Sequence, residues 1–196
     1  MSMVPYEQIA DEAWARLERA ANERSDPHRL CAFASLGQTG DPDVRYLILR
    51  GAERGSARLW FHTDRRSAKA ATLRSNPRVA LVSYDANSEI QLRVKGSVRL
   101  HEDDGITRRH WEQLGVAVRL GYESPAPPGA PTPHADPRMD EIRENVAEGR
   151  NDEGLANLMV IVVDVESIDW LQLGEPAHRR AVMRVGEAWI AQPIQP

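Results

Sequence analysis

The stretch FHTDRRSAKAATLRSNPRVALVSYD, from Phe61 to Asp85, joins two apolar runs through a short connection that is rich in cations. The connection SAKAATLRSN has the composition of a short helix, which Ser67 can cap at its start and Asn76-Pro77 can end. The flanking runs, ARLWFHT and RVALVSYD, are typical of strands because they are short and rich in apolar and β-branched residues. We therefore predict a strand, a turn, a short helix and a second strand.

The cations of this stretch allow three interpretations: a solvated helix face, a nucleic-acid patch, or a socket for one small anion. The cations are Arg65, Arg66, Lys69, Arg74 and Arg78. Nucleic acid is the weakest partner, because the net charge is −4 and no stacking aromatics lie among the cations. A helix start beside hydroxyls and cations favours an oxyanion, above all a phosphate.

A second segment supports the anion socket. In DVRYLILRG, Arg45 and Arg50 flank an apolar centre. An arginine beside a buried strand is costly unless water or an anion solvates it.

The composition of the 196 residues sets further limits. No apolar run is long enough for a membrane span, and the N-terminal residues do not resemble a secretory signal. Cys31 is the only cysteine, which excludes an intramolecular disulfide and suggests a small core residue. We expect a cytoplasmic protein that binds neither membrane nor nucleic acid, and we read no metal site.

Short apolar segments separated by turn residues predict a small antiparallel barrel or sandwich with peripheral helices. The expected strands are RLCAFASL, VRYLILRG, ARLWFHT, RVALVSYD, EIQLRVKGSVRLHE, ANLMVIVVDV, SIDWLQL, RRAVMRV and EAWIAQPI. Helices are expected near the N-terminus (within residues 1–25), over residues 103–120 and over residues 137–151. We predict a single domain over residues 1–196, with a Pro-rich loop and helical excursion at 125–155.

Several of these segments, taken in order, resemble the pyridoxamine 5′-phosphate oxidase family of FMN-binding split barrels. They are DVRYLILRG, FHTDRRSAKAATLRSNPRVAL, EIQLRVKGSVRL, SIDWLQLGEPAHRRAVM and the closing EAWIAQPIQP. The resemblance extends over nearly the whole chain from about Leu30. It implies a mainly β fold, an antiparallel split barrel, and a homodimer that holds FMN between its subunits.

The resemblance also assigns roles to individual residues. The positions that match cofactor contacts are Arg45, Tyr46, Leu47, Ile48, His62, Thr63, Ser67, Lys69, Gln91, Trp170 and Arg180. Among these, Arg45 and Lys69 match phosphate ligands, and Trp170 and Arg180 match contacts expected from the partner subunit. Arg180 is the candidate for stabilising the reduced flavin, and Arg50 and His178 are candidates for contact with a small-molecule substrate.

Two positions depart from the family pattern. Ala68 stands where the family often has an arginine before the helix lysine, and Arg65 or Arg66 is a candidate replacement. Pro176 stands in place of an arginine that belongs to the vitamer site. The resemblance thus implies an FMN-dependent oxidoreductase that is not an efficient vitamer oxidase. The alternatives are a flavin-binding protein without turnover and a reductase fed by a nicotinamide or a deazaflavin.

Overall fold

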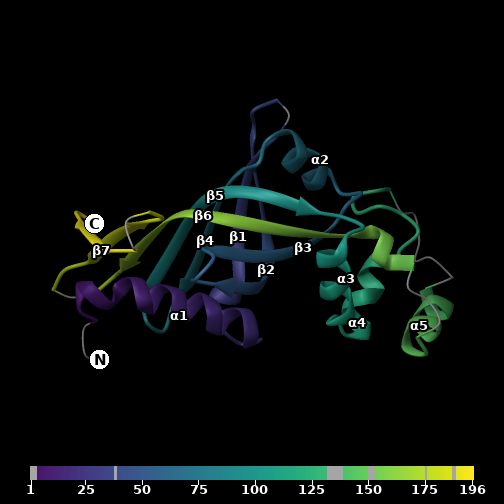
Figure 1. Cartoon of the computed structure of the whole chain (residues 1–196), viewed down its shortest axis with the longest axis horizontal. Coiled ribbons are helices and arrows are strands. Elements are labelled where there is room, and N and C mark those ends of the chain that lie inside the picture. Colours follow the sequence, from purple (N-terminus) through teal and green to yellow (C-terminus); the bar gives the residue numbers. More distant parts are fainter. Residues whose placement is uncertain (1–3, 38, 132–138, 150–152, 175, 187–188) are drawn as a thin grey trace.

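A closed antiparallel barrel forms the centre of the molecule (Figure 1). The computed structural model describes residues 4–37, 39–131, 139–149, 153–174, 176–186 and 189–196. Its strands are β1 (Leu30–Leu36), β2 (Pro42–Glu53), β3 (Arg58–Asp64), β4 (Arg78–Asp85), β5 (Ile90–His101), β6 (Leu158–Gln172), β7 (Arg179–Arg184) and β8 (Gln192–Ile194). The strand order is β3-β2-β1-β4-β5-β6-β7-β8, and pairing between β3 and β6 closes the barrel. The predicted split barrel is confirmed.

The barrel is filled by the inward-facing residues of alternating strands. Along β1, Cys31, Phe33 and Ser35 are buried, whereas the residues between them are partly or fully exposed. The rings of Phe33 and Phe61 meet edge to face inside, 5.5 Å apart. The buried Cys31 thiol, with its pKa raised to about 12 by burial, is a core residue.

Helix α1 (Ile9–Asn22) covers one side of the barrel, along the lower edge of Figure 1. Its apolar face is almost fully buried because Ile9, Ala13, Trp14 and Leu17 recur at helical spacing. This confirms the predicted N-terminal helix.

Strand β6 corrects the sequence interpretation, which split it into two strands. It is one strand of 15 residues with a bulge. Val165 pairs with Gly96 of β5 and Ser167 pairs with the adjacent Lys95, so Glu166 is the extra residue. Gly96 is needed there, because a Cβ at this position would lie 2.2 Å from the Asp164 carbonyl oxygen.

The bulge reverses which residues of β6 face the core. Before it, Ile161 and Val163 point inward, and after it Ile168 and Trp170 do. A strand alternates strictly, so one inserted residue exchanges the two faces. The orientation of every β6 residue near Trp170 depends on this feature.

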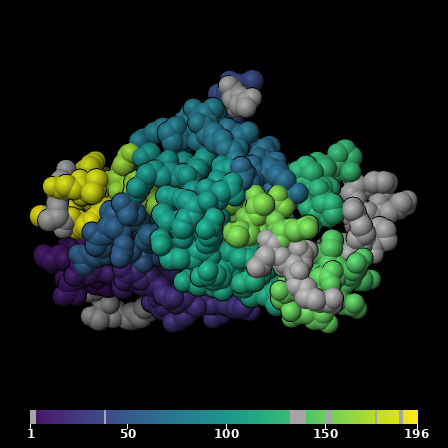
Figure 2. Space-filling view, turned by 45° about the vertical axis from the view of Figure 1, so that its right-hand side comes forward, coloured from purple at the N-terminus to yellow at the C-terminus, as the bar shows by residue number. Residues whose placement is uncertain are grey.

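The remaining helices lie at two ends of the barrel (Figure 1). Helix α2 (Ala68–Ser75) lies near the tip of the β1–β2 hairpin, which projects from the body in Figure 2. The predicted helix over residues 103–120 is broken into α3 (Gly105–Glu112) and α4 (Val116–Arg119), with Gly115 before the second part. Asp104 caps α3 by accepting hydrogen bonds from the amides of Ile106 and Thr107.

The C-terminal part of the chain adds short elements. Helix α5 (Met139–Ala147) matches the described part of the predicted polar helix, whose residues 137–138 and 150–151 lie outside the described residues. Among the described residues of EAWIAQPI, which exclude 187–188, only Gln192–Ile194 forms a strand, so that prediction was too long. Among the described residues, no helix is both long and apolar enough to cross a membrane.

Candidate functional site

Lys69 lies in the first turn of α2, where its ammonium has no carboxylate partner among the described residues. Its Nζ donates a hydrogen bond to Thr63 Oγ1 over 3.1 Å. Burial, and then the nearby charge of Arg45, lower the pKa of Lys69. Two cations that repel each other in a partly desolvated place favour the binding of an anion between them.

Arg45 reaches the same place from β2. Its guanidinium donates to Ser35 Oγ over 2.7 Å and forms an ion pair with the more exposed Asp43. Asp43 neutralises part of this charge, but it lies on the solvent side, with half of its side chain exposed. Arg45 and Lys69 are the two residues that the resemblance assigns to a phosphate.

Hydroxyl groups and free amides complete the surroundings of Lys69. Ser67 precedes α2 as expected, but its hydroxyl does not cap the helix; it donates to the Asp64 carbonyl over 2.7 Å. The amides of Ala70 and Ala71 bond the Ser67 carbonyl. Those of Ala68 and Lys69 have no acceptor within the described part of the chain, as is usual for a first helical turn. Donors and cations thus converge at one end of α2.

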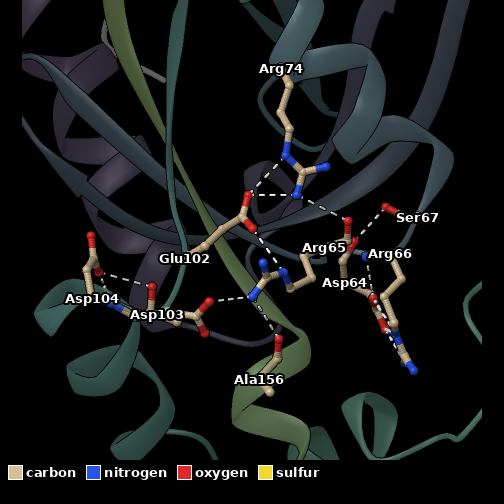
Figure 3. A network of polar contacts seen from close by, with 10 residues as sticks. Asp64, Arg65, Arg66, Ser67, Arg74, Glu102, Asp103, Asp104 and Ala156 are labelled. Atoms are coloured by element: carbon tan, nitrogen blue, oxygen red, sulfur yellow. Dashed lines mark hydrogen bonds and ion pairs between the residues drawn. The ribbon is translucent and has the colours of Figure 1, made fainter.

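The other cations of the opening stretch form ion pairs with carboxylates. Figure 3 shows the pairs of Arg65, Arg66 and Arg74. Glu102 accepts from Arg65 Nε over 2.9 Å and from Arg74 Nη2 over 2.7 Å. Arg66 binds Asp64 over 2.7 Å, and Arg78 pairs with Glu166. Arg65 and Arg66 are engaged with carboxylates here, and their role as replacements for the arginine missing at Ala68 stays a prediction. Of the five cations, only Lys69 is without a carboxylate partner in the residues that the structure describes.

The residues after Arg45 form an exposed apolar face. Val44 is 65% exposed and Tyr46 is 69% exposed, whereas Leu47 points into the core. Ile48 lies on the same outer face, and β1 adds Leu30 and Leu36, both at least 43% exposed. Exposed apolar patches of this kind commonly mark interaction surfaces.

Gln91 and Arg180 lie on the outer face of the sheet, two strands apart. Gln91 pairs with Leu171, and Leu171 pairs with Arg180, so the three form one row across β5, β6 and β7. Asp169 holds the Arg180 guanidinium over 2.7 and 3.0 Å and raises its pKa. In the closed barrel, β1 and β4 separate this row from β2, which carries Arg45, on one side, and β3 separates them on the other.

Trp170 does not join that row. Its side chain has no exposed surface, and its indole N–H donates to Glu12 of α1 over 3.2 Å. A side chain enclosed in its own subunit cannot contact a ligand on the outer face, so the expected flavin contact is not supported. Leu171 occupies the outward position instead. The sequence alone does not show that Leu171 faces outward, because the bulge at Glu166 determines whether Trp170 or Leu171 does so.

Arg50 lies on the outer face of β2 beside a cavity of about 480 Å³. The cavity is lined by Arg24, Asp26, Arg29, Leu30, Ile48, Arg50, Ala117 and Val118. Burial lowers the pKa of Arg50, and the charges of Arg29 and Arg24 act in the same direction. Asp26 is engaged by Arg19 over 2.7 Å. Arg50 has no ion pair among the described residues, so this cavity is suited to an anion with an apolar body.

His62 and His110 form a partly buried pair next to Arg50. His62 Nε2 lies 2.9 Å from His110 Nδ1, and His62 Nδ1 is buried without a partner. Burial, the His110 ring and the Arg50 charge lower the pKa of His62 to about 3. His62 is therefore neutral at physiological pH. Its ring is covered by α3, and its role as a cofactor contact stays a prediction.

His178 lies in the exposed connection before β7, next to the exposed Pro176 and Ala177. Its Nδ1 accepts a hydrogen bond from the Gly174 amide over 3.1 Å. The strand that follows it, β7, is separated from β2, which carries Arg45, by β3 and β6 on the shorter way round the closed barrel. A role at a substrate stays a prediction.

The chain is similar in sequence to a known protein family and to two of its curated members. The family model described as pyridoxamine 5′-phosphate oxidase matches residues 17–153. A pyridoxine/pyridoxamine 5′-phosphate oxidase of Legionella pneumophila is 36% identical over 78 residues, which are 40% of this chain and 35% of the relative. The matched segment thus spans about a third of that relative's length. A second such oxidase, from Arabidopsis thaliana, is 23% identical over 160 residues, 78% of both chains.

Solved structures agree with the fold. A pyridoxamine 5′-phosphate oxidase-related, FMN-binding protein from Nostoc punctiforme is similar over 100% of both chains, with a TM-score of 0.73 and 25% identity. PhzG from Burkholderia lata, solved with tetrahydrophenazine-1-carboxylic acid, gives a TM-score of 0.70 at 18% identity, over 98% of this chain and 94% of that one. The second likeness concerns the fold alone.

Proposed function

The chain belongs to the pyridoxamine 5′-phosphate oxidase family, and we propose that it is an FMN-dependent oxidoreductase that works as a homodimer. The observation that carries the proposal is the pair Arg45 and Lys69. Lys69 lacks a carboxylate partner among the described residues and is hydrogen-bonded only to Thr63. These residues fit a phosphorylated cofactor, because cations, a hydroxyl and free helix amides converge there.

In this proposal each residue of the chain has a simple task. Arg45, Lys69 and the amides at the start of α2 hold the phosphate, and the backbone of Tyr46 to Ile48 supports the flavin ring. When bound, FMN supplies the redox chemistry as a hydride acceptor at N5. Arg180 places positive charge where negative charge develops on the reduced ring, and Asp169 keeps its guanidinium oriented.

The proposed homodimer follows from the distribution of these residues. Arg45 and Lys69 come from β2 and α2, whereas Gln91 and Arg180 lie in a row across β5, β6 and β7. We propose that the two groups reach one flavin from two different chains. A second copy packed on the exposed face of Val44, Tyr46 and Ile48 would give such a shared site, since this apolar face adjoins Arg45 on β2.

The substrate in this proposal is a small anionic molecule that contacts Arg50. Pro176 lacks the charge and the donors of the arginine that the vitamer site has in the family, and Pro176 is exposed. Loss of one clamping group misplaces a substrate and is costly in rate. We therefore expect slow turnover of pyridoxamine phosphate and pyridoxine phosphate.

The test is an assay of the FMN-reconstituted protein. We expect it to bind FMN and to release peroxide from either vitamer phosphate far more slowly than a vitamer oxidase measured in parallel. Absence of FMN binding would overturn the cofactor proposal. Turnover equal to that of the reference oxidase would show that Pro176 matters less than argued. Reduction only by a nicotinamide or deazaflavin donor would identify a reductase.

A further inference from the structure

A second basic cavity lies on the other side of α3, against the outer faces of β3, β5 and β6. It has a volume of about 330 Å³ and is lined by Arg58, Trp60, Arg99, His101, Ile106, Arg109, His110 and Val162. Five of these eight residues are arginine or histidine, and none is acidic. The cavity shares no lining residue with the cavity at Arg50.

Two of the arginines are held in place by one carboxylate. Asp164 on β6 accepts from Arg99 over 2.6 Å at both of its oxygens and from Arg58 Nε over 3.2 Å. These arginines lower the pKa of Asp164, which is thus ionised. One negative charge is shared between two positive charges, and each guanidinium keeps N–H groups that Asp164 does not use. The pair is oriented but not neutralised.

The α3 side of the cavity adds a third cation. Arg109 has no hydrogen bond or ion pair with any residue that the structure describes. Burial, and then the charges of Arg109 and His101, lower the pKa of His110. All three side chains line the same cavity, where an anion beside Arg109 would oppose this lowering.

The two imidazoles are oriented by bonds on their other nitrogens. His101 Nδ1 lies 2.7 Å from Asp104 Oδ2, and His110 Nδ1 lies 2.9 Å from His62 Nε2. Nε2 of each ring is not used in either bond. Trp60, Ile106 and Val162 supply an apolar wall beside these polar groups. Fixed donors next to an apolar wall are typical of a ligand site.

We propose that this cavity binds a phosphate-type oxyanion, free or carried on a small apolar body such as an aromatic ring. The guanidinium groups of Arg58, Arg99 and Arg109 match the geometry of phosphate oxygens. The wall at Trp60 accommodates the organic part. This site is separate from the proposed flavin site and does not depend on it.

The test is calorimetric titration of the FMN-treated protein with inorganic phosphate and with phenyl phosphate. Arg109→Ala is expected to weaken both probes roughly 10- to 100-fold, because one charge-assisted contact is lost. Arg108→Ala is the matched control: Arg108 lies on the same helix, is exposed and does not line the cavity. We expect this variant to bind within twofold of the unmodified protein. Circular dichroism verifies that both variants are folded.

Lys69→Ala separates the two proposals, since it alters the α2 end and leaves this cavity intact. Phosphate binding that persists in Lys69→Ala and is lost in Arg109→Ala supports the second site. Binding lost in Lys69→Ala and kept in Arg109→Ala would overturn it, as would equal effects of Arg109→Ala and Arg108→Ala, or no binding at all. Tighter binding of phenyl phosphate than of phosphate supports the organic ligand; equal binding favours free phosphate.

Discussion

Lys69 and Arg74 lie on the same short helix, yet their charges meet different surroundings. Arg74, at the end of α2, shares Glu102 with Arg65 (Figure 3). Lys69, at the start of the helix, faces Arg45 and a hydroxyl. The comparison teaches that the number of cations in a segment says little about anion binding. The two cations differ because Arg74 is paired with Glu102, whereas Lys69 has no carboxylate partner among the described residues.

The first prediction concerns the exposed apolar face beside Arg45. Val44→Asp should give a monomer that no longer binds FMN, because a carboxylate cannot be buried without a partner at a subunit interface. Light scattering and the flavin absorbance measure both effects. Val185→Asp is the control, since Val185 is also exposed but lies just after β7. A dimeric, yellow Val44→Asp protein would exclude this face as the interface.

The second prediction concerns Glu102, the carboxylate that pairs with Arg65 and Arg74. Glu102→Gln should lower the free energy of unfolding by roughly 1–2 kcal/mol, because Arg65 and Arg74 lose their shared carboxylate but stay partly solvated. FMN affinity should change less than threefold, since neither arginine is part of the proposed socket. Urea unfolding and FMN titration test the two statements. A large loss of FMN affinity would mean that the two ends of α2 are not independent.

The third prediction uses pH and has the smallest effect. The pKa of Lys69 is lowered from 10.5, so its charge is lost at a lower pH than that of an ordinary lysine. FMN affinity should therefore fall several-fold as pH rises from about 7.5 to 10, while a bound phosphate opposes the loss. Lys69→Arg, which keeps its charge, should remove most of the decline. A decline of the same size in Lys69→Arg would assign it to another group.

Much of the fold could be predicted from alternation and turn residues. Strand β4 has the predicted bounds, Arg78–Asp85, because it is a clean apolar run between Pro77 and a turn. Strand β6 could not be predicted in full: polar Asp164 and Glu166 resemble a break, and only pairing with β5 shows a bulge. That bulge turns Leu171 outward and buries Trp170, an orientation that the sequence alone does not show.

The candidate site was predictable in part, for a similar reason. Arg45 and Lys69 are local features of their segments, and the structure brings them together. The partners of Arg65, Arg66 and Arg78 come from Asp64, Glu102, Asp103 and Glu166, three of which are distant in the chain. Distant carboxylates cannot be assigned without the fold. The cavity at Arg58 and Arg109 depends on α3 packing against β6 and was not predicted at all.

Lys69 is proposed to bind the phosphate of FMN. The test is a thermodynamic cycle with two proteins and two ligands. FMN and riboflavin are each titrated into the unmodified protein and into Lys69→Ala. We expect FMN to bind far more tightly than riboflavin to the unmodified protein. Lys69→Ala should reduce this preference for FMN roughly 10- to 100-fold, or roughly 1.5–3 kcal/mol. Equal affinities of the unmodified protein for FMN and riboflavin, or an unchanged preference for FMN in Lys69→Ala, would show that Lys69 does not bind the phosphate.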